Sequence, residues 1–202
     1  MGLAALLIAI GSLIATAVGL GFARKASDAA NTANQIERDR RHAELRPRYS
    51  VSCTHQMGTE DLTLKVQLAG PGELEGIDDI TVTILDDSVF RLKQPDASDQ
   101  IWGPYRFRPG TGPGVGTRGG TGADSAGRVT TSEGMPVGEA HLYALEPTPY
   151  PPRASWDTPR WRLQVGPMLR LRIDTSKVGW DPWVAVGELD TTYDTGQTLE
   201  LT

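Results

Sequence analysis

The segment of the chain most suggestive of chemistry is a glycine-rich stretch between Arg108 and Arg128. Within it, residues 114–119 (GVGTRG) match the G-x-G-x-x-G pattern of loops that cradle the phosphates of a nucleotide. Such a loop binds phosphate because a helix opens directly after the glycines and its N-terminus faces the anion. The residues that follow show no helical periodicity, and no lysine stands where a P-loop needs one. We therefore predict a disordered, glycine-rich strand connection over 109–138 and no bound cofactor.

The other reactive side chains do not form a recognisable catalytic or metal-binding set. Cys53 is the single cysteine, so it has no thiol partner for a disulfide or a metal site, and we expect it to be a packed thiol. His55 lies two residues away and shares a strand face with it, but nothing in the sequence marks a third, activating group. The sequence thus predicts no enzyme, no catalytic residue and no metal ligand.

Tryptophan is the remaining candidate for recognition. Exposed aromatic rings on a β-sandwich can form a face that binds sugars or peptides, although large aromatic side chains more often fill a core. Packing in the core or over a sheet end is the favoured interpretation, with a binding patch as the alternative. The residues of that alternative patch are Trp156, Trp161, Trp180 and Trp183.

The N-terminal segment is typical of a membrane anchor. Residues 2–23 are apolar without one charge, and Arg24 and Lys25 follow directly. About 20 apolar residues are enough to cross a hydrocarbon core of roughly 30 Å, so we predict a single transmembrane helix over 1–23. A cleavable signal peptide is the rival interpretation, because residues 15–17 (ATA) have the small-x-small form of a cleavage site.

Small residues recur every four positions inside this predicted helix, at Gly11, Ala15 and Gly19. This spacing lets two helix backbones approach closely, so we predict that the helix pairs into a homodimer. Residues 24–48 lack glycine and consist largely of good helix formers up to Pro47, which predicts a polar helical stalk or juxtamembrane linker.

The periodicity changes from helical to alternating at residue 49. Polar and apolar residues alternate over 61–68, 79–84 and 170–174, as expected of strands with one buried face. Glycine, proline and aspartate clusters separate them, and no amphipathic helix of ten residues follows residue 50. We predict an all-β domain over 49–202, an antiparallel β-sandwich with Ig-like architecture. Further strands are expected at 49–54, 102–108, 140–145, 161–165, 183–189 and 198–201.

Charge is divided unevenly along the chain. Residues 24–48 hold seven basic and four acidic side chains, whereas residues 49–202 hold 13 basic and 21 acidic ones. The basic flank after the apolar segment predicts that the C-terminal domain faces the cytoplasm, with an extracytoplasmic domain as the alternative. The basic stalk would be attracted to anionic lipid headgroups, and the negative charge of the domain disfavours binding of nucleic acid.

Three segments strengthen the picture of an anchored domain: residues 41–47 (RHAELRP), 102–110 (WGPYRFRPG) and 169–172 (LRLR). Together with the uncharged N-terminal helix, they resemble uncharacterised membrane-anchored proteins of actinobacteria. The resemblance implies an anchored β-sandwich and no particular cofactor or site. We therefore expect a non-enzymatic module at the plasma membrane that binds an unknown protein partner at the inner face. The alternative is an exported, anchored domain that binds cell-wall carbohydrate through its Trp residues.

Overall fold

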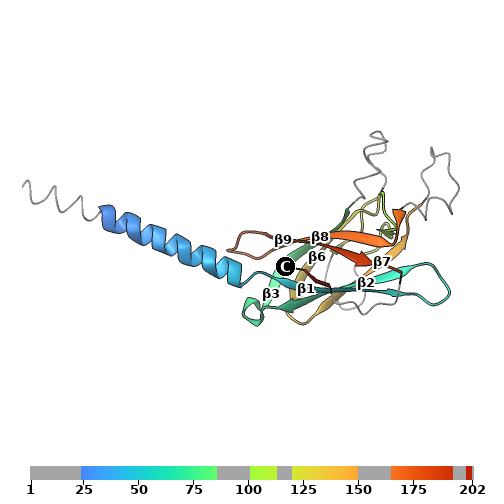
Figure 1. Cartoon of the computed structure of the whole chain (residues 1–202), viewed down its shortest axis with the longest axis horizontal. Helices are drawn as coiled ribbons and strands as arrows, with labels where there is room; N and C mark the ends of the chain where they lie inside the picture. The colour runs from blue at the N-terminus through green and yellow to red at the C-terminus, as the bar shows by residue number, and fades with distance from the viewer. Residues whose placement is uncertain (1–23, 86–100, 113–119, 150–164, 193–198, 202) are drawn as a thin grey trace, which may run out of the picture. The chain divides into compact units, whose positions relative to one another are not determined.

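The computed structural model describes residues 24–85, 101–112, 120–149, 165–192 and 199–201. The chain divides into two compact units, Met1–Glu44 and Leu45–Thr202. The described part of the first unit is an α-helix over 24–44, as expected for the stalk (Figure 1). The predicted transmembrane helix over 1–23, with its pairing residues Gly11, Ala15 and Gly19, lies outside the described residues.

The helix over 24–44 is exposed to solvent along almost its whole length. Its surface carries ion pairs one turn apart, such as Arg40 Nε to Glu44 Oε1 at 2.8 Å, and the apolar side chain of Ile36 is exposed. A helix that is polar on every side is stabilised by such local pairs and by helix propensity rather than by a buried stripe. Within the described residues, no helix has the length and apolar character needed to span a membrane.

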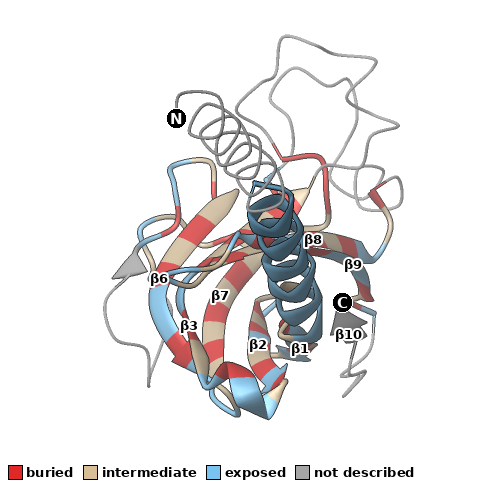
Figure 2. Cartoon of the chain, turned by 90° about the vertical axis from the view of Figure 1, so that its left-hand side faces the viewer, coloured by how far each residue is buried: buried red, intermediate tan, exposed pale blue. Residues whose placement is uncertain are grey.

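The second unit is an all-β, sandwich-like structure of two antiparallel sheets, which confirms the predicted fold class at this level (Figures 1 and 2). The first sheet has the strand order β10-β1-β2-β7-β4 and the second has the order β5-β6-β3-β8-β9. The first sheet contains β10 (Leu199–Leu201), β1 (Arg48–His55), β2 (Leu62–Gly70), β7 (Ala140–Pro147) and β4 (Tyr105–Phe107). The second contains β5 (Gly120–Thr121), β6 (Val129–Pro136), β3 (Gly76–Leu85), β8 (Met168–Ser176) and β9 (Trp183–Asp190), and a 3-10 turn η1 (Gly72–Leu74) lies between β2 and β3.

The core fills the space between the sheets with every second side chain of the long strands. In β2 these are Leu62, Leu64, Val66 and Leu68, all fully buried. The same alternation appears as red bands along β6 and β7 in Figure 2. Burying one such aliphatic side chain stabilises the fold by roughly 1.5–3 kcal/mol. Cys53 is part of this core, as expected for a packed thiol.

A buried hydrogen bond also joins the two sheets directly. Tyr49 on β1 donates from its hydroxyl to Thr175 Oγ1 on β8 at 3.0 Å, and both side chains are buried. Burial raises the pKa of the Tyr49 hydroxyl, so the group stays protonated and remains a donor. Because a buried hydroxyl without a partner is costly, this bond favours one relative position of the sheets.

The prediction of a disordered loop over 109–138 is wrong in its second half, where β5 and β6 lie. Strand β6 pairs with β3 over seven residue pairs, yet it was missed because Thr130 and Ser132 occupy inward positions where a strand usually carries Val or Ile. The first half contains the G-x-G-x-x-G residues, and 113–119 lie outside the described residues. The predicted strand over 102–108 is shortened to the three residues of β4.

A tight turn, residues 124–127, leads into β6. Gly127 adopts a φ of 74°, and a Cβ at this position would lie 2.2 Å from the carbonyl oxygen of Phe107. The same glycine accepts a hydrogen bond from Phe107 N at 2.8 Å, so the two backbones cannot separate without losing it. Gly58, in the β1–β2 turn, has a similar φ of 78° but open space around it.

Replacing these two glycines separates backbone strain from steric contact. We expect Gly58→Ala to lower the free energy of unfolding by about 1–2 kcal/mol, because only the left-handed conformation is strained. Gly127→Ala adds the clash with Phe107, so it should lower the free energy of unfolding by about 1 kcal/mol or more beyond the effect of Gly58→Ala. Urea unfolding of the full chain measures both. Equal losses would show that β4 does not approach Gly127 as described.

Candidate functional site

The candidate functional site is the outward surface of β8 and β9. Alternation in β9 places Trp183, Ala185 and Leu189 on the inner side and Val184, Val186 and Glu188 on the outer side. Val184 is 39 % exposed and Val186 52 % exposed, and Met168 at the start of β8 is 41 % exposed. In the β8–β9 register the Arg170–Glu188 pair lies between Met168 and the two valines. Outward apolar side chains on two neighbouring strands are typical of surfaces that another molecule covers. We call these three side chains the β8–β9 apolar face.

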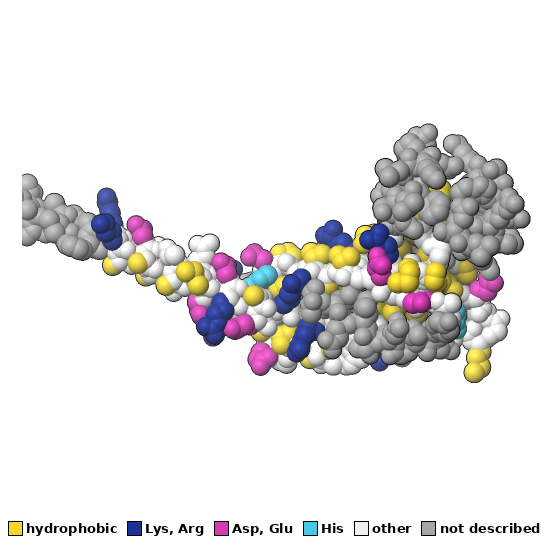
Figure 3. Space-filling view, in the orientation of Figure 1, with side chains coloured by type: hydrophobic (Ala, Val, Ile, Leu, Met, Phe, Trp, Pro, Cys, Tyr) yellow, Lys and Arg dark blue, Asp and Glu magenta, His cyan; other side chains and the backbone are white. Residues whose placement is uncertain are grey.

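Ion pairs flank the β8–β9 apolar face. Arg172 lies opposite Val186 in the β8–β9 register, and it pairs with Asp174 on its own strand at 2.6 Å. Arg170 lies opposite Glu188 and pairs with it at 2.8 Å. Both guanidinium groups therefore have a carboxylate partner, and the surface around the valines carries little net charge. Figure 3 shows hydrophobic side chains mixed with charged ones where Figure 1 labels β8 and β9.

A hollow adjoins one end of this face. It is a cavity of about 320 Å³ to which Met168, Arg170 and Glu188 contribute from β8 and β9. Leu85 and Trp102 form part of its apolar wall. An apolar surface that continues into a hollow offers shape as well as area, which is what a specific partner needs.

The backbone of β9 is also oriented toward the edge of its sheet. Val184 O accepts a hydrogen bond of 3.4 Å from the Arg46 guanidinium, so this carbonyl points away from β8. In an antiparallel strand the N–H and C=O of one residue point to the same side, and this repeats every second residue. Val184, Val186 and Glu188 therefore direct backbone groups to the outer edge of the described sheet. Such an edge can accept an added strand.

A serine and a histidine lie in hydrogen-bonding contact inside the core. Ser132 Oγ is 2.8 Å from His141 Nδ1 and 3.2 Å from the Tyr143 hydroxyl. A Ser–His pair at this distance resembles an activated nucleophile, but Ser132 and His141 are each 1 % exposed, so no substrate reaches the Ser132 hydroxyl. Because β6 and β7 belong to different sheets, the cluster joins the sheets as the Tyr49–Thr175 bond does.

The tryptophans singled out by the sequence are only partly described. Trp183 is 5 % exposed and belongs to the core, and Trp180 packs against the same core. The two rings stack with centroids 6.3 Å apart. Trp156 and Trp161 lie outside the described residues. Where the structure describes the chain, the predicted aromatic patch is therefore a packed pair of rings rather than an open platform.

The described residues contain no group of three His, Cys, Asp or Glu side chains that could hold a metal ion.

The sequence reasoning missed the outward positions of Val184 and Val186, although a signal was present. Residues 183–186 (WVAV) are apolar at every position, so one of the two faces had to carry apolar side chains outward.

No family model matches the chain, and neither the curated proteins nor the solved structures contain a match. The resemblance to actinobacterial membrane-anchored proteins therefore stays a prediction based on the segments quoted above. Function has to be inferred from the surfaces of the chain itself.

The buried cluster predicts how stability depends on pH. Burial lowers the pKa of His141 below its usual 6.5, and the Glu139 carboxylate opposes this only in part. Below about pH 6.5 the unfolded chain therefore binds a proton more readily than the folded chain. The contribution of neutral His141 to the free energy of unfolding is fully present above pH 6.5. It is lost as the pH falls toward the folded-state pKa, by at most about 1.4 kcal/mol per pH unit.

Thermal or urea unfolding between pH 7.5 and 5 measures this slope. We expect His141→Gln to flatten it, because a neutral amide replaces the titrating ring, while His55→Gln should leave most of it in place. A slope unchanged by His141→Gln would contradict the assignment.

Proposed function

We propose that the chain is a non-enzymatic, single-pass membrane-anchored module whose β-sandwich binds a protein partner at the inner face of the plasma membrane. The observation that carries the proposal is the β8–β9 apolar face, in which Met168, Val184 and Val186 are exposed and β9 is the last strand of its sheet among the described residues. The two antiparallel sheets support the further proposal of an Ig-like architecture.

The partner that fits this surface is an extended protein segment that adds a strand to β9. Its backbone would bond to the outward groups of Val184 and Val186, displacing the Arg46 guanidinium from Val184 O, and its apolar side chains would cover the valines. Burying apolar area contributes about 25 cal/mol per Å² before the cost of ordering the segment. Arg170 and Arg172 would mainly fix the register of the added strand, because each already pairs with a carboxylate.

The anchor in this proposal is the apolar segment 1–23, followed by the polar helix over 24–44. Gly11, Ala15 and Gly19 would allow two anchors to pair, which would place two sandwiches on one stalk pair. The basic residues that follow the apolar segment support a cytoplasmic C-terminal unit.

A second candidate is an exported, anchored domain that binds cell-wall carbohydrate through tryptophan. The observation in favour of this candidate is that the Trp180 ring, which stacks on Trp183, is only partly buried. Membrane topology distinguishes the two candidates, since a cell-wall ligand is met only outside the membrane.

Binding through β9 is tested by crosslinking in cells. A photo-crosslinking amino acid in place of Val186 should give a discrete adduct with a partner, whereas the same amino acid in place of Thr54 should not. Thr54 is the matched control because it is an exposed strand residue on the other sheet. Val184→Lys should abolish the Val186 adduct while changing the free energy of unfolding by no more than about 0.5 kcal/mol. Equal adducts from both positions, or none from position 186, would contradict the proposal.

The orientation is tested with reporters fused to the C-terminus. A fluorescent protein that matures in the cytoplasm should be bright, and an alkaline phosphatase that needs export should be inactive. Lys or Arg in the first residues of the chain, before the apolar segment, should weaken this orientation, because basic flanks are retained inside. An active phosphatase in the unmodified chain would favour the exported candidate instead.

A further inference from the structure

A larger cavity lies at one end of the sandwich, next to the hollow that adjoins the β8–β9 apolar face, and it shares Pro104, Val165 and Gly166 with that hollow. Its volume is about 550 Å³, within the range of small-molecule sites. The β1–β2 turn, the start of β4 and the end of β7 contribute to it from the first sheet, and the segments before β8 and after β9 contribute from the second. The cavity therefore spans the open end between the two sheets.

Hydrogen bonds across the sheets hold the walls of this cavity in place. His55 Nε2, at the end of β1, donates to Thr191 O, directly after β9, at 3.0 Å. Thr191 in turn donates from its backbone N and its hydroxyl to Pro167 O, at 3.0 and 2.6 Å. Thr148 N donates to Pro104 O at 3.0 Å on the opposite wall. A site whose walls are already bonded loses little entropy when it binds a ligand.

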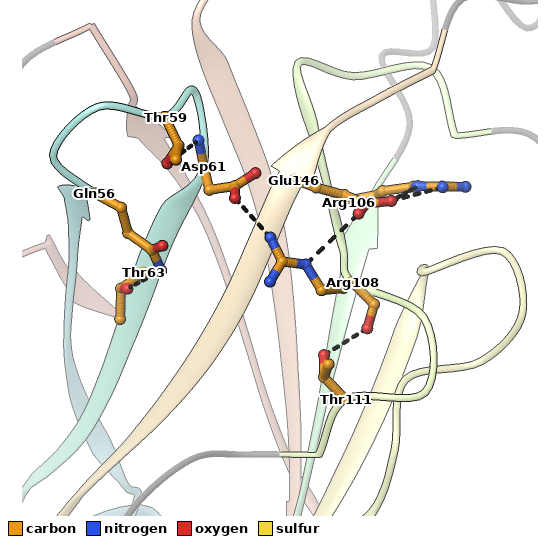
Figure 4. Close-up of polar contacts among 8 residues, drawn as sticks. All are labelled: Gln56, Thr59, Asp61, Thr63, Arg106, Arg108, Thr111 and Glu146. Carbon is orange, nitrogen blue, oxygen red and sulfur yellow. Dashed lines mark hydrogen bonds and ion pairs between the residues drawn. The ribbon is translucent and has the colours of Figure 1, made fainter.

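Ion pairs beside the cavity fix the β1–β2 turn (Figure 4). Arg108 reaches Asp61 Oδ2 at 2.6 Å and lies 3.7 Å from Glu146 Oε2, while Arg106 binds Glu146 at 2.6 Å. These contacts connect the turn, β4 and β7. They also pair both nearby arginines with carboxylates, so neither guanidinium is left to attract an anion into the cavity.

The described lining of the cavity has a distinct chemical character. It contains no lysine or arginine, and its one carboxylate is Glu60. Its polar groups are mainly hydroxyls, and Tyr105, Val165 and three prolines supply apolar surface. The hydroxyl-bearing threonines of the lining are Thr59, Thr148, Thr191 and Thr192. The Glu60 carboxylate disfavours phosphates and carboxylates, whereas a ligand that combines hydroxyl groups with an apolar C–H face matches the described lining.

Thr148 supplies an unpaired polar group beside the cavity. It lines the cavity, its side chain is 7 % exposed, and its Oγ1 is buried without a hydrogen-bond partner. Buried polar groups in folded proteins are rarely left in this state, because leaving one unpaired is costly. A rotation of roughly 120° about χ1 moves the hydroxyl to another staggered position, so the hydroxyl can turn toward a ligand that offers a partner.

We propose that this cavity is a binding site for a neutral polyhydroxyl ligand, a saccharide of one or two rings. The C–H face of the sugar would lie on Tyr105 and the prolines, and its hydroxyl groups would bond to Glu60 and the threonines. Met168, Val184 and Val186 of the β8–β9 apolar face are not among the described lining residues of this cavity. Of the two described tryptophans in the Trp patch of the exported candidate, neither Trp180 nor Trp183 lines it.

The proposal is tested by NMR titration of the full chain in a detergent whose headgroup is not a sugar. The neutral probes are glucose, mannose, galactose, N-acetylglucosamine and trehalose, and the charged counterparts are glucuronate and glucosamine. We expect at least one neutral probe to shift the resonances of Thr148, Tyr105 and Thr191, with glucuronate binding at least about tenfold more weakly.

Two variants separate binding from folding. Thr148→Val keeps the shape and removes the unpaired hydroxyl, so the melting temperature should be unchanged or higher while the affinity falls about tenfold. Thr54→Val is the matched control, because Thr54 is an exposed strand residue that is not itself part of the lining, and it should leave the affinity unchanged. Unaltered affinity in Thr148→Val, no shift with any neutral probe, or tighter binding of glucosamine than of every neutral sugar would overturn the proposal.

Discussion

Each sheet buries one apolar face against the other, and the remaining features of the second unit depend on this burial. Inward side chains of β1, β2 and β7 meet those of β3, β8 and β9 in a single cluster of buried residues. Because a strand alternates its side chains, choosing the inner set also determines what lies outside. The outward positions of Val184 and Val186 follow from the burial of Trp183 and Ala185.

Apolar burial does not by itself determine how the sheets are aligned, because it has no direction. Two buried polar contacts supply that direction: the Tyr49–Thr175 bond and the Ser132–His141–Tyr143 cluster. Both connect one sheet to the other, and both are costly to break in a medium of low dielectric constant. The pair that most resembles catalytic machinery therefore has a structural role, and the cost of burying its histidine makes stability depend on pH.

The two proposed binding surfaces lie where the sheets do not cover one another, at an edge and at one end of the sandwich. At the β9 edge, backbone groups and apolar side chains face outward together. At the end lined by Tyr105 and Thr148, the two sheets diverge and leave a cavity whose walls are bonded across both. These two places differ in chemistry, since one is apolar and extended and the other is concave and rich in hydroxyl groups. The proposed protein and saccharide ligands therefore contact different kinds of surface.

The fold class could be predicted before the structure, because alternation over β2, β3 and β8 is a local property that burial of one face requires. The sequence also indicated the helix over 24–44 from composition. It did not reveal β6, whose buried Thr130 and Ser132 look polar until their partners across the core are known. Only the tertiary structure decided that Trp183 lies inside, that Ser132 meets His141, and that Tyr105, Thr148 and Thr191 surround one cavity. These residues are distant in the sequence, and their chemistry depends on contacts between sheets that no local pattern records.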